Sequence, residues 1–193
     1  MNMHLSRFFS LSLFGLVTVT LAGCAGPDVD RASLENQARD ITRQFTTTLL
    51  PTLQEALASG GPVNAIEVCS IRAPEIADEI SAATSWSVRR VSLKARNSQR
   101  ANPDRWERET LEQFEAEQLN GVTAEALNES TVVGGEFRYM QAQLAMPLCL
   151  TCHGSNLSED VSAALRQHYP DDLATGYEVG DVRGAISLRF SLD

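Results

Sequence analysis

The chain has 193 residues and a formal net charge of −9, with 16 Lys and Arg against 25 Asp and Glu. Its length allows one domain with a proper core and is short for two domains. An acidic chain of this kind is not expected to bind nucleic acid, or to be drawn to anionic lipid by its charge. A basic protein partner would fit it better.

The chain begins with a segment typical of a bacterial lipoprotein signal. Arg7 gives a positive start, residues 8–22 are mainly apolar, and Leu-Ala-Gly-Cys at 21–24 matches the lipobox. The apolar run is too short and too rich in Ser and Thr for a transmembrane helix. An uncleaved anchor or an ordinary secretory signal is the alternative. We expect residues 1–23 to be the signal peptide.

Lipidation of Cys24 predicts a location for the protein. Acyl chains on this residue would hold the protein on a membrane surface without a spanning helix, with residues 24–30 as a lipidated tether. The same signal would export the chain, so we expect it on the periplasmic side of a bacterial membrane. Ala25 follows the cysteine, where lipoproteins kept in the inner membrane often have Asp, and this favours the outer membrane.

The predicted domain, residues 31–193, opens with helices. Apolar residues recur at helical spacing from about residue 30 to residue 59. Pro51 should kink this first helix, and the glycine pair at 60–61 should end it.

Two shorter helices should follow. Pro62 suits the first turn of a helix over roughly 62–72, in which Cys69 lies on the buried face. Pro74 should open a third helix that ends at about residue 83.

Two more helices are predicted further along the chain. Asn102 can cap the first, with Pro103 at its first helical position, and this helix runs to about residue 119. Ser158 can cap the second, of about ten residues, which must stop before Pro170.

The second half of the chain also contains strands. Alternating patterns predict a strand over 86–93 and a half-buried closing strand over 185–192. Val132-Val133 extends another strand before a glycine turn, and residues 136–144 form the next strand after it. Helices come first and strands later, without the spacing of βαβ units. The pattern therefore predicts an α+β fold with an antiparallel sheet.

A Cys-x-x-Cys-His motif occupies residues 149–153. Two thiols at this spacing can each add to a haem vinyl group, and the histidine that follows can supply an axial nitrogen to the iron. The motif therefore predicts one covalent haem c, attached through Cys149 and Cys152, with His153 as an iron ligand.

Three other interpretations of the motif stay open at this point. A thioredoxin-like dithiol should open the helix of a βαβ unit, whereas a loop-forming Gly-Ser-Asn follows here. A structural disulfide at this spacing would be labile. A zinc site would lack the second closely spaced ligand pair; its candidate ligands are Cys69, Cys149, Cys152 and His168.

Cys69 has no partner once Cys24 takes lipid and the motif takes haem. A leftover cysteine in an oxidising compartment can be a buried apolar residue, an intermolecular disulfide or a metal ligand. Met140 and Met146 are rival axial ligands, because Met/His ligation is common in cytochromes c. Met146 lies so close to Cys149 that reaching the opposite haem face would be awkward.

Two arginines are candidates for the haem periphery. Arg96 and Arg183 could pair with propionates, because guanidinium binds carboxylate in a bidentate manner, although ordinary surface or turn roles are the alternative. We find neither a Ser/His/Asp set nor a phosphate loop in the sequence. Catalysis would need an open iron site and distal groups that the sequence does not identify, so an enzyme is not predicted.

The chain resembles the Tll-type c-type haem domain family, whose fold is PAS-like. The resemblance rests on the motif Cys-Leu-Thr-Cys-His-Gly together with flanking segments that keep the family's order and spacing. In the family's Arg-Asn-Pro motif, Ser98 stands here in place of the proline. The matching segments are residues 60–77, 96–107, 149–154 and 169–185.

This resemblance implies a single PAS-like domain in which His153 and a cysteine thiolate hold the haem iron from opposite sides. The family's ligand cysteine maps onto Cys69. Similar domains occur as exported sensor parts of signalling proteins, which implies a sensor of redox state or of a small ligand that acts through a partner protein. A low-potential electron-transfer cytochrome c is the alternative.

Overall fold

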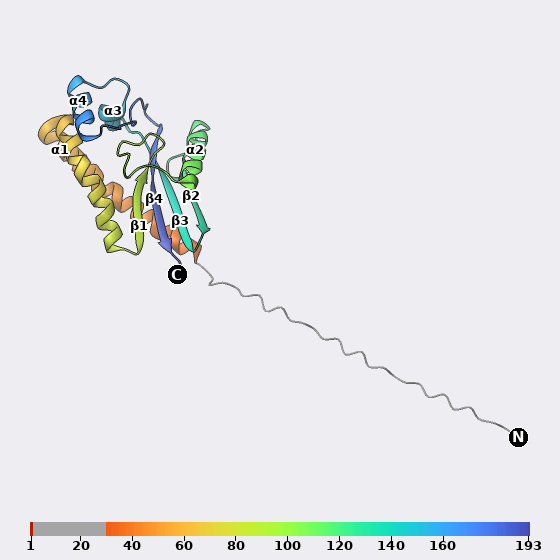
Figure 1. The fold of residues 1–193 in the computed structure, drawn as a ribbon. Helices are drawn as coiled ribbons and strands as arrows, with labels where there is room; N and C mark the ends of the chain where they lie inside the picture. Colours follow the sequence, from red (N-terminus) through yellow and green to blue (C-terminus); the bar gives the residue numbers. More distant parts are fainter. Residues whose placement is uncertain (2–29) are drawn as a thin grey trace.

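The structure is a computed structural model that describes Met1 and residues 30–193. Four strands form one antiparallel sheet in the order β1-β4-β3-β2, and helices cover both of its faces (Figure 1). This is the α+β architecture with an antiparallel sheet that the sequence predicts. The strands are β1 (Trp86–Val91), β2 (Asn128–Val133), β3 (Glu136–Leu144) and β4 (Val182–Ser191).

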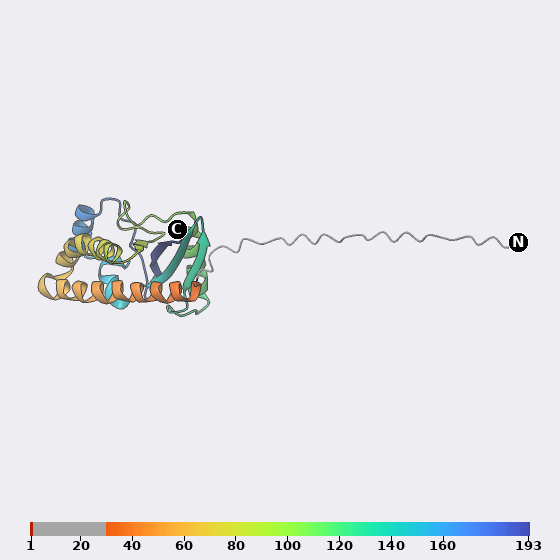
Figure 2. The same ribbon diagram turned by 90° about the horizontal axis from the view of Figure 1, so that it is seen from below.

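The long helix α1 (Arg31–Ala83) consists of two arms joined at Gly61. There φ is 71° and ψ is −168°, a conformation that glycine adopts without steric cost. The glycine pair therefore ends the first arm, residues 31–60, as predicted. The second arm is residues 62–83. Figure 2 shows the first arm running along the whole length of the domain.

The proline predictions within α1 are wrong. Helical backbone angles continue through both Pro51 and Pro74, and Gly61 is the only interruption in α1. The second arm is thus one helix, where the sequence predicted two that met at Pro74. A proline removes one helical hydrogen bond, but Ile76 and Ile80 just beyond it are buried in the core. Their burial stabilises the continuous helix more than the missing bond weakens it.

Both arms of α1 pack on one face of the sheet. Trp86 of β1 is the largest aromatic of this core, and its ring lies edge-on to Phe137 of β3. The first arm has 30 residues and is about 45 Å long at 1.5 Å per residue, so it extends well past the end of the strands. The core residues of this layer are Leu34, Ala38, Ile41, Phe45, Ile76, Ala77, Ile80, Trp86, Val88, Phe137, Tyr139, Ile186 and Leu188.

Helix α2 (Arg105–Leu119) covers the other face, where Leu111 and Phe114 pack on β3 and β4. Its cap differs from the predicted one. Asp104 caps the helix by accepting the Glu107 backbone N–H at 2.9 Å, and the Glu107 carboxylate accepts the Asp104 N–H at 2.8 Å. This reciprocal box satisfies two free donors at once, whereas the Asn102 side chain is engaged with the Ser98 carbonyl at 2.7 Å.

Strand β4 is central and buried on both faces, which corrects the prediction of a half-buried closing strand. Residues 185–188 are each 1% exposed or less. The polar member of this run, Ser187, donates to the Glu107 carboxylate at 2.7 Å. Alternate side chains of β4 therefore point toward α1 on one face of the sheet and toward α2 on the other. The sequence pattern had predicted that one of these two faces would be exposed to solvent.

Some of the remaining elements follow the predictions, whereas β2 begins at Asn128, earlier than predicted. β3 has the predicted bounds, the turn before it places Gly134 and Gly135 at positive φ, and Ser158 caps helix α4 (Glu159–His168). Within the residues that the structure describes, no helix has both the length and the apolar character needed to cross a membrane. The signal peptide and Cys24 lie outside the described residues.

Candidate functional site

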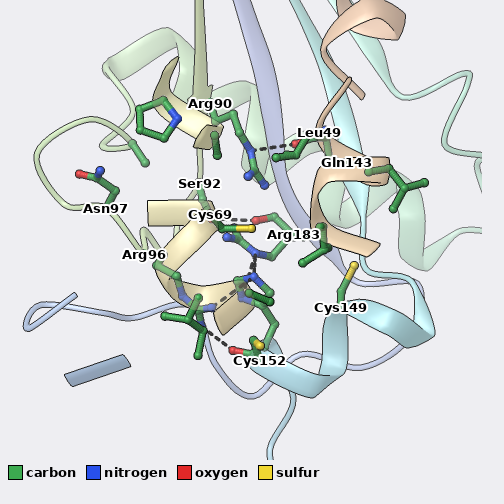
Figure 3. Close-up of a pocket in the computed structure, with 18 of the residues that line it drawn as sticks. Leu49, Cys69, Arg90, Ser92, Arg96, Asn97, Gln143, Cys149, Cys152 and Arg183 are labelled. Carbon is green, nitrogen blue, oxygen red and sulfur yellow. Dashed lines mark hydrogen bonds between the residues drawn. The ribbon is translucent and has the colours of Figure 1, made fainter. Parts of the chain in front are cut away.

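A cavity of about 260 Å³ lies where β1 and β3 end and the first arm of α1 continues past them. Segments that are far apart in the chain meet around it, including both arms of α1, the loop after β1 and the Cys-x-x-Cys-His segment (Figure 3). This cavity brings together all of the site residues predicted within residues 30–193. They are Cys69, Arg96, Cys149, Cys152, His153 and Arg183.

One wall of the pocket is a row of leucines on the first arm of α1. Leu49, Leu53 and Leu57 recur every four residues, which places them on one face of the helix. Beyond the end of the sheet this face has no strand to cover, so it faces the cavity. Ile66 on the second arm and Leu148 on the motif side add to the apolar lining. An apolar pocket with a few polar groups is typical of a cofactor site.

The motif folds as a 3-10 turn, η1 (Pro147–Cys149), followed by one turn of helix, α3 (Leu150–His153). Cys149 and Cys152 are three residues apart on this helical segment, so both can face the cavity. All cysteines of the described part of the chain are free. Burial raises the pKa of the Cys152 thiol, and the charge of Arg96 opposes that rise. The structure therefore holds two free thiols at one wall of the pocket.

His153 is held in the form that can bind a metal. Its Nδ1 lies 2.7 Å from the Ala174 carbonyl oxygen, which can only accept, so Nδ1 carries the proton and Nε2 keeps its lone pair. Arg183 Nε lies 3.1 Å from Nδ1 and 3.3 Å from Nε2, and Arg96 Nη1 lies 3.5 Å from Nε2. Because Nδ1 carries the proton, Nε2 is the nitrogen that accepts from these donors. Burial and these two cations lower the pKa of His153, so the imidazole is neutral. Nε2 is therefore the ring nitrogen that keeps a lone pair, and in this structure the lone pair faces the N–H groups of Arg183 and Arg96.

Arg96 ties the motif to the segment that follows α4. Its guanidinium pairs with Asp172 at 3.1 Å and donates to the carbonyls of Ala174, also at 3.1 Å, and of Cys152. The side chains of Arg96 and Asp172 are only 11% and 9% exposed. Asp172 thus helps to position His153. One sequence holds no signal for this pair, because its members are far apart in the chain.

Cys69 faces the same cavity from the second arm of α1 (Figure 3). It is half-buried, and burial raises the pKa of its thiol, with Arg90 opposing that rise. Its position on the helix face that the sequence predicted to be buried brings it into the pocket with the motif. Cys69 and the motif reach the cavity from different elements of the fold.

The rival ligands are placed differently. Met140 is completely buried and packs against the α2 layer, away from the cavity, whereas Met146 lies at the cavity and is 45% exposed. His168 is not among the residues that line the cavity. Among the described residues, no group of three or more His, Cys, Asp or Glu side chains is arranged to hold a metal ion. The zinc interpretation therefore gains no support.

Sequence reasoning missed three arginines that line the pocket, Arg89, Arg90 and Arg100. Arg90 of β1 is the one without a carboxylate partner among the described residues. Its side chain extends into the cavity, and its Nε donates to Gln143 of β3 at 3.2 Å (Figure 3). The signal was present in the alternation of β1, which puts Arg90 on the same face of the sheet as Trp86 and Val88. An arginine on a core-facing position is a departure from the apolar pattern and marks the point where the core becomes a pocket.

Comparisons with known proteins agree with the family resemblance that the sequence shows. The Tll0287-like family model matches residues 29–191. Among solved structures, the crystal structure of the cyanobacterial heme-protein Tll0287 is similar to this chain, with a TM-score of 0.60 and 23% sequence identity. The match covers 88% of this chain and 98% of that one, and at this identity it shows the fold. The search of curated proteins finds no match.

Proposed function

The chain belongs to the Tll0287-like family, and from this premise we propose that it binds one haem c covalently through Cys149 and Cys152. His153 would be an axial ligand of the iron. The observation that carries the proposal is that the two free thiols and a neutral imidazole with its Nε2 lone pair all line one apolar pocket.

The residues of the pocket fit such a group. The leucine row and Ile66 offer apolar surface to a porphyrin, and the arginines predicted to meet its propionates, Arg96 and Arg183, both line the cavity. The structural relative is described as a heme-protein. A bound haem would supply an iron that exchanges one electron and can take a further ligand.

We propose Cys69 as the second axial ligand. It lines the same cavity as the motif, while Met140 is buried against α2 and Met146 lies at the mouth directly beside Cys149. Thiolate is a good ligand for ferric iron, because the metal lowers the pKa of the thiol and the anion neutralises the charge of the iron.

We further propose that the protein is a sensor of redox state or of a small ligand. Cys69 lies on the second arm of α1, eight residues after the break at Gly61, whereas His153 belongs to α3. Release of Cys69 from the iron would therefore let the second arm of α1 move relative to the motif, and a partner protein could recognise that movement. Electron transfer by a low-potential cytochrome c is the second candidate, favoured by the exposure of Met146 and Leu173 beside the motif segment.

The location is part of the same proposal. Cys24 follows the lipobox pattern, so we propose a lipid anchor at this residue and a protein on the periplasmic side of a bacterial membrane, with the outer membrane favoured by Ala25. A redox or signalling protein would be its partner. The acidic net charge gives no reason to expect nucleic acid.

The covalent attachment is tested with protein produced alongside a haem-attachment system. The haem should survive acid-acetone extraction and add the mass of one haem to the mature chain. Cys149→Ala or Cys152→Ala should leave at most one thioether, while Cys69→Ala, the matched control, should retain the covalent haem. Haem that is extracted freely from the wild type would refute covalent binding.

A spectrum of the reduced protein with and without CO separates the two functions. Uptake of CO after reduction, with loss of the thiolate signature, supports sensing. A reduced iron that keeps both ligands and refuses CO supports electron transfer.

A further inference from the structure

All charged side chains that line the pocket are positive. The chain as a whole is acidic, with a net charge of −9, yet five arginines and no Asp or Glu line this cavity. The excess is therefore local, and it indicates a ligand with negative charge. The five are Arg89, Arg90, Arg96, Arg100 and Arg183.

Three of these arginines have carboxylate partners behind the pocket wall. Arg96 and Arg100 each have a carboxylate of their own, so their charges are balanced within the protein. Arg89 belongs to a cluster in which Glu107 and Asp104 are shared with Arg138 and Arg189. The pairs are Arg89 with Glu107 at 3.0 Å, Arg96 with Asp172 at 3.1 Å, and Arg100 with Asp78.

Arg90 and Arg183 have no carboxylate partner among the described residues. Arg90 Nε donates to Gln143 at 3.2 Å, and Arg183 Nε lies against His153, while no acceptor within residues 30–193 meets the terminal Nη atoms of either arginine. Burial lowers the pKa of both guanidinium groups, that of Arg183 to about 9. Unpaired cations in an apolar pocket are unfavourable. An anionic ligand that pairs with Arg90 and Arg183 would therefore be stabilised in this pocket.

We propose that Arg90 and Arg183 form a clamp for the two propionates of the haem, each taking one carboxylate. This inference rests on the proposed function. With a Cys69 thiolate as ligand, the charges of ferric iron, porphyrin ring and thiolate cancel, which leaves the two propionates as the whole charge of the group. Two carboxylates match the two unbalanced guanidiniums, whose terminal nitrogens can bind them in bidentate fashion.

Arg96 has a different role in this assignment. Asp172 neutralises it, and two carbonyls, of Cys152 and Ala174, hold its Nη2 in place. Its Nη1 lies 3.5 Å from His153 Nε2. Arg96 is therefore a positioning residue for His153. Figure 3 shows Arg90 above Cys69, Arg183 next to Cys69, and Arg96 at the left edge of the pocket.

The experiment uses two probes, haem and haem dimethyl ester, which differ only in the charge of the propionates. Their affinities are measured by absorbance titration of the Cys149→Ala/Cys152→Ala protein, in which binding is reversible. Haem should bind more tightly than the diester. Adding Arg90→Gln should weaken haem binding about ten- to a hundredfold, in line with the loss of one charge-assisted pair, and leave the affinity for the diester nearly unchanged.

Arg100→Gln is the matched control, because Arg100 lines the same pocket but is paired with Asp78. It should leave both affinities unchanged. For Arg183→Gln the ratio of the two affinities is the measure, since Arg183 also contacts His153. Arg90→Lys keeps the charge, and its affinity for haem should lie between those of the wild type and Arg90→Gln. It replaces Arg90→Gln in the experiment if circular dichroism shows that the glutamine variant folds poorly.

Equal binding of haem and its diester, or an equal loss of both in Arg90→Gln, would overturn the clamp. Such a result leaves covalent attachment intact, because attachment is judged separately by acid-acetone extraction of the wild type. Conversely, a wild type without covalent haem would remove the proposed function while the titrations still report whether the arginines recognise the carboxylates.

Discussion

Replacing Arg96 by Ala removes the contact that joins the motif to the segment after α4. The substitution deletes the donors to Cys152 and Ala174 and leaves the Asp172 carboxylate without its partner. The side chain of Asp172 is 9% exposed, so water cannot fully replace the lost guanidinium. One contact does remain, because Asp172 still accepts the Ala174 N–H at 2.8 Å.

These contacts set the expected size of the effect. Breaking one side of a buried ion pair costs about 3–5 kcal/mol, and the remaining contact of Asp172 places Arg96→Ala at the lower end, at about 3 kcal/mol. For a chain of this length each kcal/mol lowers the melting temperature by about 2–4 °C. We therefore expect a fall of roughly 6–12 °C. Removing the stranded carboxylate as well, in Arg96→Ala/Asp172→Ala, should restore part of the loss.

Urea unfolding of the haem-free protein, followed by circular dichroism, measures these free energies. Arg100→Ala is the control, because its pair with Asp78 is open to solvent, with side chains 47% and 58% exposed. Such pairs contribute about 0–1 kcal/mol. If Arg96→Ala costs no more than Arg100→Ala, the pair with Asp172 is not a buried one in solution, and its assigned role in positioning His153 is wrong.

Three further predictions concern other parts of the molecule. Cys69→Ala should change the ferric spectrum, raise the reduction potential and open a site for CO; an unchanged spectrum and potential would mean that Cys69 is only a packing residue. Gly184→Ala should destabilise the fold by about 1–3 kcal/mol or more, because the added Cβ would lie 2.4 Å from the Val91 carbonyl oxygen; Gly121→Ala, at positive φ but with open space, should cost less in the same urea assay. Cys24→Ser should release the exported protein from membranes on fractionation, and retention with an intact N-terminus would instead indicate an uncleaved anchor.

Local patterns predicted those elements whose stability is decided locally. β3 has the predicted bounds, and the glycine turn at 134–135 marks its start directly in the sequence. The cap of α2 was predicted two residues early, at Asn102, because asparagine is a common N-cap residue. The reciprocal hydrogen bonds between Asp104 and Glu107 make Asp104 the cap in the structure. Pro74 was taken as a helix start, since the packing of the second arm cannot be seen from local preference.

Some residues of the candidate site could likewise be predicted from local sequence, and others could not. Cys149, Cys152 and His153 stand together in the sequence, so their chemistry could be predicted without knowledge of the fold. The ion pair of Arg96 and Asp172 could not be predicted from the sequence, because only the folded chain brings the two residues together. Arg90 was visible as a polar residue on the inner face of β1, but its significance depends on knowing that the core ends there and a cavity begins.

The strand order carries a consequence for the time at which the pocket closes. Within the described residues β1 pairs only with β4, so Trp86 meets its neighbour Phe190 only after nearly the whole domain has been synthesised. Contacts between such distant segments form late, because loop closure must precede them. Cys149 and Cys152 emerge before β4, so a growing chain presents both thiols while the sheet is still incomplete. Under the proposed covalent attachment, the late arrival of β4 would leave an interval in which an attachment enzyme could reach the motif before the sheet is complete.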